Sequence, residues 1–275
     1  MKKEQSSDYV LGNSDSELQR LIEQSLFYRE LTSQFLRSSG LKDGMRVLDV
    51  GCGAGDVSFF AKELVGPTGS VLGIDKSTEA IVLAQKRAVA TDVTRVNFEV
   101  GDILNLDVER KFDALIGRLI LMYFPDPAKV LKTLVKHINP GGIVAFQEMD
   151  MSIVKSVPES PSYDQCCNWI LSTFKSAQIQ TDFGPKLYSI YLNAGLPSPK
   201  MSMGARIGGG PDAPGYEYAT NVLRSLLPMS EKFGVTNAEE VKLDTLTDRI
   251  KQEVISNKGV VISPAMVGAW TRTRS

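Results

Sequence analysis

The sequence predicts an α/β fold built on a parallel sheet, and two observations carry this prediction. Between residues 46 and 147, short apolar segments alternate with segments of helical periodicity, which is typical of strand–helix–strand units with right-handed crossovers. The first apolar segment also runs directly into Gly51, Gly53 and Gly55, which indicates a turn where the backbone closely approaches another group. Because ligands of open α/β sheets bind at the carboxyl ends of the strands, this turn is a candidate binding site.

The expected elements of the first half follow in a regular order. A helix over residues 14–36 has an approximate apolar stripe, and Ser14 or Asp15 can cap its start. Apolar runs predict strands over residues 46–50, 70–74, 96–100, 112–117 and 142–147. Helical patterns between them predict helices over residues 57–65, 78–90 and 127–138.

The alternation ends after Asp150, where Pro158 and Pro161 interrupt the pattern. Helices are expected over residues 163–176, 185–194, 216–227 and 238–256. A sixth strand is expected within residues 200–207, and residues 266–271 suit a last strand.

Composition and charge agree with a soluble enzyme. The 275 residues carry 31 basic and 32 acidic side chains, so no net field attracts nucleic acid or an anionic membrane. No apolar run is long enough to span a bilayer, and residues 1–7 lack a following apolar stretch typical of a secretory signal. The three cysteines, Cys52 and the adjacent Cys166 and Cys167, predict neither a disulfide framework nor a metal site. We therefore expect a cytoplasmic protein without nucleic-acid or membrane partners.

The spacing of the glycine turn narrows the class of cofactor. Residues 51–56 read Gly-Cys-Gly-Ala-Gly-Asp, so Asp56 stands where a dinucleotide-binding turn has its third glycine. An aspartate at the start of the following helix disfavours a diphosphate there and favours a cationic or zwitterionic ligand. Asp49, just before the turn, favours the same kind of ligand.

Two further carboxylates follow the next two strands. Asp75 ends the second strand, where it can accept hydrogen bonds from both ribose hydroxyls of an adenosine. Asp102 follows the third strand and can accept from the exocyclic amine of adenine. Each also has a structural alternative, Asp75 as the N-cap of the helix over residues 78–90 and Asp102 as a turn residue. Acidic residues at three successive strand ends favour the cofactor site over these alternatives.

Together these features resemble the class I S-adenosylmethionine-dependent methyltransferases, most closely the small-molecule branch similar to ubiquinone and menaquinone biosynthesis enzymes. The matching segments are residues 47–55, 73–75, 101–103 and 112–116 and the Asn-Pro-Gly-Gly turn at residues 139–142. The resemblance implies a Rossmann-like sheet of seven mostly parallel strands, helices on both faces, an antiparallel last strand and a helical cap. It also implies S-adenosyl-L-methionine as the methyl donor and S-adenosyl-L-homocysteine as its product.

The resemblance further implies a division of the chain. Residues 1–40 are expected to form an N-terminal helical lid, and residues 41–150 the cofactor-binding core. Residues 151–199 are expected to form a helical cap insertion, and residues 200–275 the remaining strands and helices with substrate-side helices.

The family's binding residues can be placed on matching positions of this sequence. The turn that holds the methionine part of the cofactor corresponds to Asp49, Gly51, Cys52 and Gly53. The expected ribose contact is Asp75, the adjacent Lys76 is a further expected cofactor contact, and the expected adenine contacts are Asp102 and Ile103. The resemblance also implies that Tyr9 and Gln24 close over the cofactor and that Arg118 lies against it. Arg20 shares the helix face of Gln24 but packs equally well on the sheet edge, and Arg118 has the alternative of a solvated turn arginine.

Catalytic residues are harder to assign, because the sulfonium of the cofactor is already activated. Methyl transfer needs alignment and exclusion of water, and it needs a general base only for a poor nucleophile. Glu148, Asp150 and Tyr123 are candidates because they lie at or beyond the carboxyl ends of the fourth and fifth strands. Glu148 and Asp150 are expected to point into a substrate cleft, or else to cap the following segment. The one histidine, His137, is expected to complement a helix dipole rather than to catalyse.

Aromatic and methionine side chains indicate the kind of acceptor. Those that follow the fifth strand are Tyr163, Trp169, Phe174, Phe183, Tyr188, Tyr191, Met201, Met203, Tyr216, Tyr218 and Met229. As a pocket lining they suit an apolar or aromatic small molecule, and as core residues they carry no information on the substrate. The alternatives are a nucleic-acid or protein methyltransferase of the same fold, a non-catalytic S-adenosylmethionine-binding protein and, less favoured because of Asp56, a nicotinamide dehydrogenase.

Overall fold

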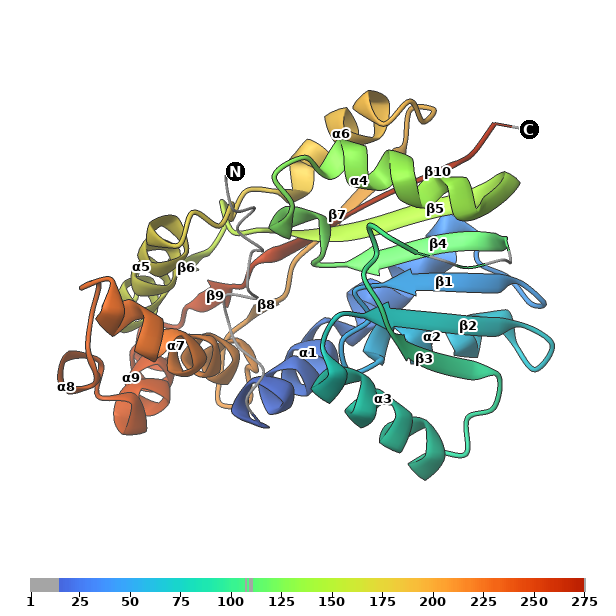
Figure 1. Cartoon of the computed structure of the whole chain (residues 1–275). Coiled ribbons are helices and arrows are strands. Elements are labelled where there is room, and N and C mark those ends of the chain that lie inside the picture. The colour runs from blue at the N-terminus through green and yellow to red at the C-terminus, as the bar shows by residue number, and fades with distance from the viewer. Residues whose placement is uncertain (1–14, 107, 109–110, 275) are drawn as a thin grey trace, which may run out of the picture. The chain divides into compact units, whose positions relative to one another are not determined.

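The computed structural model describes residues 15–106, 108 and 111–274 and, in the first helix, the side chains from Gln24 onward. Over these residues the chain forms two compact units. The larger unit contains residues 24–153, 182–206 and 264–274, and the smaller contains residues 15–23, 154–181 and 207–263. Both units are therefore assembled from segments that lie far apart in the sequence (Figure 1).

A seven-stranded sheet forms the centre of the larger unit, in the order β3-β2-β1-β4-β5-β10-β7. The strands are β1 (Arg46–Val50), β2 (Ser70–Asp75), β3 (Val96–Val100), β4 (Phe112–Arg118), β5 (Ile138–Asp150), β7 (Lys200–Gly204) and β10 (Ala265–Arg272). Strands β1 to β5 run parallel to one another, whereas β10 runs antiparallel to both β5 and β7. This arrangement confirms the predicted seven-stranded, mostly parallel sheet with an antiparallel last strand (Figure 1).

Helices cover both faces of this sheet, as predicted, because alternate strand residues point to opposite faces. On one face Ile143 and Ala145 of β5 pack in a core cluster with α1 (Asp15–Ser39), α2 (Asp56–Val65) and α3 (Thr78–Ala90). On the other face Val144 and Phe146 pack in a cluster with α4 (Pro127–Leu134) and α6 (Leu187–Asn193). The same cluster includes residues of the short 3-10 helix η1 (Leu121–Tyr123), which connects β4 to α4. The side chain at each strand end is therefore directed toward one helix layer or the other.

Several element boundaries differ from the prediction for local reasons. Strand β5 begins at Ile138, so the expected turn at residues 139–142 lies within the strand, where the pairing with β4 is irregular between Phe112 and Ala114. The helix expected over residues 127–138 ends at Leu134 and continues as the 3-10 turn η2 (Val135–His137). The helix expected over residues 238–256 divides into α8 (Ala238–Val241) and α9 (Leu243–Ser256), because Lys242 adopts a left-handed conformation with φ of 51°.

The smaller unit combines helices with a second sheet that the sequence did not predict. Its further elements are α5 (Pro161–Ser176), α7 (Gly215–Lys232), β6 (Lys155–Val157), β8 (Ile207–Gly208) and β9 (Val260–Ile262). The three strands pair antiparallel in the order β6-β9-β8, so the single strand expected over residues 200–207 is in fact β7 and β8 in two different sheets. Glu253 of α9 accepts the N–H of Ser162 at 2.8 Å and thereby caps α5.

Most of the aromatic residues considered above as a pocket lining are core residues. Tyr163, Trp169 and Tyr216 are at most 9% exposed in the smaller unit, and Phe183 and Tyr191 are at most 3% exposed in the larger one. The Tyr191 hydroxyl donates to the Ala269 carbonyl at 2.7 Å, which ties α6 to the sheet. These side chains therefore stabilise the fold and give little information on the acceptor.

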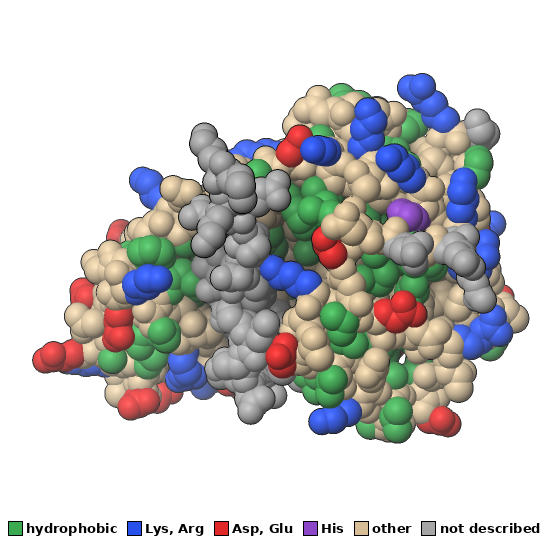
Figure 2. Space-filling view, viewed as in Figure 1, with side chains coloured by type: hydrophobic (Ala, Val, Ile, Leu, Met, Phe, Trp, Pro, Cys, Tyr) green, Lys and Arg blue, Asp and Glu red, His purple; other side chains and the backbone are tan. Residues whose placement is uncertain are grey.

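The described residues show no sign of a membrane-spanning helix or of a metal-binding cluster. Within this part of the chain, no helix combines the length and the apolar character needed to cross a membrane. Across the same residues, no group of three or more His, Cys, Asp or Glu side chains could hold a metal ion. On the face seen in Figure 2, basic and acidic side chains both occur among neutral and hydrophobic ones.

Candidate functional site

The turn between β1 and α2, residues 50–56, has a backbone held in place by its neighbours. The N–H groups of Gly51 and Cys52 donate to the Ile74 carbonyl at 2.8 and 3.1 Å, and the Gly55 N–H donates to the Cys52 carbonyl at 2.9 Å. Gly51, Gly53 and Gly55 all have positive φ, at 66°, 52° and 85°, a region that L-residues rarely adopt. The glycines are therefore required by the backbone path of this turn.

The space around each glycine separates their roles. A Cβ at Gly51 would lie 2.6 Å from Cδ1 of Ile120, and a Cβ at Gly55 would lie 2.6 Å from Cζ of Phe98. A Cβ at Gly53 would meet no described atom within 4 Å. Gly51 and Gly55 thus allow close packing inside the protein, whereas Gly53 leaves room for the backbone to approach a ligand.

Asp75 at the end of β2 joins the turn directly. Its Oδ2 accepts the Gly53 N–H at 2.8 Å, and its Oδ1 accepts the Ser77 N–H at 2.9 Å. The N-cap of α3 is Ser77, whose hydroxyl accepts the Ala80 N–H, so the alternative reading of Asp75 as the N-cap is wrong. Each carboxylate oxygen keeps acceptor capacity for a hydroxyl, and Lys76 beside it is exposed.

Asp49 presents a buried carboxyl beneath the same turn. Its Oδ2 accepts the Ser58 hydroxyl at 2.6 Å, and its Oδ1 has no hydrogen-bond partner among the described residues. Burial raises the pKa of Asp49 to about 7, although the Ser58 hydrogen bond and the charge of Arg118 lower it. Burial likewise raises the pKa of the Cys52 thiol well above its usual value, so this side chain stays a neutral thiol. An unpartnered buried carboxyl oxygen suits a cationic ligand group.

Arg118 at the end of β4 belongs to a polar network with α1 and β5. Its Nη1 donates to the Thr32 hydroxyl at 3.2 Å, and that hydroxyl donates to Oε1 of Gln147 at 2.9 Å. Thr32 and Gln147 are both at most 2% exposed. The reading of Arg118 as a solvated turn arginine is therefore wrong. Nothing in the sequence pattern indicated Thr32, Gln147 or Ser58, because the packing of α1 and α2 on the sheet brings Thr32 and Ser58 to these polar partners.

Other predicted residues lie in less informative positions. Asp102 is exposed, and its carboxylate accepts the Leu104 N–H at 2.9 Å and the Asn105 amide at 2.7 Å, as a turn residue does. Ile103 is buried and packs in the cluster on the α4 face. Gln24 is buried on α1, while Tyr9 and the side chain of Arg20 lie outside the described residues.

The three catalytic candidates are placed differently from one another. Glu148 of β5 is fully buried, and its Oε1 accepts backbone N–H groups of the turn after β4. Asp150 is 4% exposed and accepts the Ser152 N–H at 2.9 Å. Tyr123 is half-buried in η1. Asp150 thus caps the segment that follows it, as the alternative expected, whereas Glu148 holds a turn that precedes β5 in the chain.

His137 lies at the opposite end of β5 from the catalytic candidates Glu148 and Asp150. It ends η2 just before the first residue of β5, at the amino end of a strand whose carboxyl end holds Glu148 and Asp150. Burial and the neighbouring Lys136 lower its pKa below the usual 6.5, so the imidazole is neutral at pH 7. A neutral imidazole complements the helix dipole less than a cation would, and the dipole role of His137 stays a prediction.

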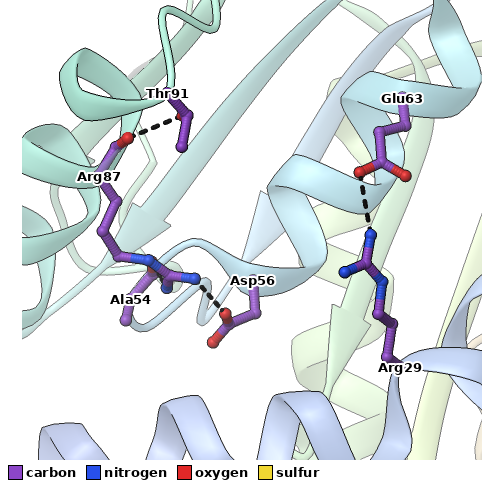
Figure 3. Close-up of polar contacts among 6 residues, drawn as sticks. All are labelled: Arg29, Ala54, Asp56, Glu63, Arg87 and Thr91. Atoms are coloured by element: carbon purple, nitrogen blue, oxygen red, sulfur yellow. Dashed lines mark hydrogen bonds and ion pairs between the residues drawn. The ribbon is translucent and has the colours of Figure 1, made fainter.

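Asp56, the first residue of α2, is neutralised by an arginine that the sequence did not indicate. Nη2 of Arg87 on α3 contacts Asp56 at 2.7 Å, and its Nη1 donates to the Ala54 carbonyl at 2.6 Å (Figure 3). Arg87 also lies over the Phe59 ring, 5.2 Å from its centroid. Asp56 is therefore a structural partner of α3 rather than a free anion facing a ligand. The exposed Arg29–Glu63 pair in the same view, at 3.5 Å, contributes little.

Replacing Arg87 by methionine is expected to destabilise the protein by about 1–3 kcal/mol, because a largely buried Asp56 loses its partner. Urea unfolding of the wild type, Arg87→Met and the exposed control Lys86→Met gives the difference. Combining Arg87→Met with Asp56→Asn should cost less than the sum of the two single changes. Equal stabilities of Arg87→Met and Lys86→Met would show that the pair does not hold the turn.

Comparison with known proteins identifies similar sequences. Residues 41–188 match a family described as "Methyltransferase domain". The demethylmenaquinone methyltransferase of Staphylococcus saprophyticus is 30% identical over 168 residues, which are 60% of this chain and 68% of that protein. Phosphoethanolamine N-methyltransferase 1 of Zea mays is 33% identical over 135 residues, 49% of this chain and 26% of that protein. The match thus spans about a quarter of the plant enzyme.

Solved structures share the fold at low sequence identity. A putative methyltransferase of Bacillus halodurans has a TM-score of 0.58 at 15% identity, with 89% of this chain and 99% of that chain covered. Phosphoethanolamine N-methyltransferase 2 of Haemonchus contortus, in complex with phosphomonomethylethanolamine and S-adenosylhomocysteine, has a TM-score of 0.53 at 18% identity. That match covers 90% of this chain and 53% of the other.

Proposed function

This chain belongs to the methyltransferase domain family, and from that premise we propose that it transfers a methyl group from S-adenosyl-L-methionine to a small, apolar or aromatic organic acceptor. The single observation that carries the proposal is the geometry at Gly53. Its Cα faces space free of described atoms, and its N–H donates to the Asp75 carboxylate at the end of the adjacent strand. A turn of this kind lets the backbone approach a ligand while the neighbouring carboxylate accepts its hydroxyl groups.

The residues present suit S-adenosyl-L-methionine in three respects. Asp75 can accept the ribose hydroxyls, and Gly53 leaves space for the methionine part. Asp49 offers a buried oxygen without a partner among the described residues, which suits a cationic group of the cofactor. When bound, the cofactor would supply a methyl group on a sulfonium. The acceptor would bond to the methyl carbon as the carbon–sulfur bond breaks, which leaves S-adenosyl-L-homocysteine. The other predicted contacts of the cofactor remain predictions, and they are Arg118, Cys52, Lys76, Gln24, Tyr9, Asp102 and Ile103.

The contribution of this chain to the reaction is mainly alignment and exclusion of water. Arg118, Thr32 and Gln147 hold α1 against the carboxyl ends of β4 and β5. Asp150 and Tyr123 remain the candidates for a proton acceptor where the methyl acceptor is a hydroxyl or a carbon acid, whereas the Glu148 carboxyl holds two backbone N–H groups.

We choose the acceptor class from the demethylmenaquinone methyltransferase, because this chain covers a larger share of it than of the plant relative described above. That relative is named for demethylmenaquinone, an apolar quinone, and the chain covers 68% of it. Other relatives are named for phosphoethanolamine and for arsenite, but their matches cover at most 35% of the relative. We therefore place an apolar or aromatic acceptor first, with those two acceptors as competing outcomes of the test.

Calorimetric titration with S-adenosyl-L-methionine, S-adenosyl-L-homocysteine and NADH tests the cofactor. Binding of the first two at micromolar Kd, without binding of NADH, is the expected result. A methyl-transfer assay with labelled cofactor then compares a demethylated quinol, phosphoethanolamine, arsenite, a duplex DNA and a protein mixture. Transfer to the quinol alone supports the proposal, and transfer to DNA or protein overturns it. Cofactor binding without transfer to any acceptor would indicate a non-catalytic binding protein.

A further inference from the structure

We propose that Glu148 is a positioning residue, which holds the turn after β4 so that the Ile120 side chain packs against the glycine turn. This inference rests on the proposed function, because it assigns Glu148 a role at the cofactor site. It differs from a catalytic role, since Glu148 acts through the turn and does not touch the reacting atoms.

Glu148 contacts the backbone of the turn after β4 directly. Its Oε1 accepts the N–H groups of Ile120 at 3.0 Å and Leu121 at 2.8 Å. These N–H groups belong to the start of η1, where a helix cannot satisfy its own donors. Ile120, the N-cap residue of η1, has no polar side chain to cap them. Glu148 therefore supplies from β5 the cap that the turn itself lacks.

The Ile120 side chain of this turn lies against the glycine turn. A Cβ built on Gly51 would lie 2.6 Å from Cδ1 of Ile120, and one built on Gly117 would lie 2.9 Å from its Cγ2. Ile120 thus fills the space over two glycines, one in the cofactor turn and one in β4. Movement of the turn after β4 would withdraw this side chain from Gly51, so the two turns are packed as one unit.

The backbone at the start of the turn after β4 has an uncommon conformation. Leu119 has φ of 54°, a left-handed conformation that is uncommon for a leucine. Its N–H donates to the Gln147 carbonyl at 2.9 Å. The turn is therefore held at two consecutive residues of β5, the Gln147 backbone and the Glu148 side chain. Such a conformation persists only where its surroundings hold it.

The environment of Glu148 gives the role a measurable signature. The carboxyl is fully buried, its Oε2 has no hydrogen-bond partner among the described residues, and burial raises its pKa to about 8. The titratable group that interacts with it is Tyr191 of α6, whose own pKa burial raises well above 10, so it stays neutral. Glu148 is therefore protonated at pH 7 and ionises near pH 8. Ionised, it accepts stronger hydrogen bonds from the turn.

The test combines Glu148→Gln, which keeps an acceptor oxygen but cannot ionise, with Glu148→Ala, which removes the acceptor. Wild-type affinity for S-adenosyl-L-homocysteine, a probe without a transferable methyl group, is expected to rise as pH increases through about 8, relative to the Gln variant. At pH 7 the Gln variant should bind within about threefold of wild type, and the Ala variant about tenfold or more weaker. An equal pH dependence in wild type and Gln variant overturns the proposal.

Further variants cover the case in which Glu148→Ala does not fold. Ile120→Ala removes the packing over Gly51 without touching the carboxyl, and it should weaken the same ligand. Val130→Ala, in the same core cluster but on α4, should lower stability without changing affinity. Loss of turnover in Glu148→Gln with unchanged affinity and pH dependence would instead make Glu148 a direct proton carrier.

The inference and the proposed function can fail separately. Hydrogen exchange of the Ile120 and Leu121 amides in the ligand-free protein reports the cap alone. Faster exchange in Glu148→Ala than in wild type supports the cap even if the wild type binds no S-adenosyl-L-methionine, a result that would overturn only the proposed function. Unchanged exchange of both amides overturns the positioning role.

Discussion

Replacing Asp75 by alanine is expected to weaken S-adenosyl-L-methionine binding by about 2–4 kcal/mol, or about 30-fold to 900-fold in Kd. The substitution removes the carboxylate proposed to accept the ribose hydroxyls. It also removes the acceptor of the Gly53 N–H, so the cofactor turn loses one of its restraints. Calorimetric titration at fixed salt and pH gives the change in Kd.

Two variants make the Asp75 result interpretable. Glu99→Ala removes an exposed carboxylate from the neighbouring strand β3 and should leave Kd unchanged, which controls for the loss of one negative charge. Asp75→Asn keeps one acceptor oxygen and should bind with intermediate affinity. If Asp75→Ala binds the cofactor as wild type does, Asp75 is not a ribose contact.

Gly53→Val is expected to abolish detectable cofactor binding while the protein remains folded. The new side chain would occupy the space that no described atom fills within 4 Å, which is the space proposed for the ligand. The positive φ of 52° adds a strain of about 1–2 kcal/mol, which is less than the stability of a typical domain. Calorimetry gives the binding, and urea unfolding gives the stability.

Gly55→Ala is the matched control for this experiment. Its Cβ would lie 2.6 Å from the Phe98 ring, so the change should destabilise the fold by about 1–3 kcal/mol through overpacking. Where Gly55→Ala still folds, it should retain more affinity than Gly53→Val. A Gly53→Val protein that binds S-adenosyl-L-methionine would show that the glycine turn is not the cofactor site. Gly51→Val is a poorer test, because its side chain would first displace Ile120.

The sheet was predictable because its signals are local. Each signal is a short run of neighbouring residues. These runs are Asp49 with the glycines after it and the apolar runs that end at Asp75 and Arg118, whose apolar residues are mostly buried on both faces of the sheet. Parallel strands of this kind have few alternatives in how they connect. The sheet β6-β9-β8 was not predictable, since strands of two or three residues are too short to show a period.

The site was predictable in its position but not in its contacts. Asp56 and Arg87 lie 31 residues apart, and their pairing depends on how α2 and α3 pack on the sheet. Glu148 was correctly placed at the end of β5, but its side chain shares the face of Val144 and Phe146 and meets η1 there. The sequence shows which residues end the strands, whereas the side-chain directions depend on helices whose positions only tertiary packing fixes.

The segment from β9 to β10 also constrains the order in which the protein can fold during synthesis. β9 is the central strand of the three-stranded sheet, and β10 lies between β5 and β7 in the seven-stranded sheet. Neither sheet can reach its native pairing until residues 260–272 have left the ribosome, although β1 to β5 can already pair among themselves. Until then β5 and β7 each have an unpaired edge, which is a site for association with other chains. Both units therefore complete their folding only once this segment is available, and chaperone dependence is expected to be greatest for nascent chains that end just before residue 260.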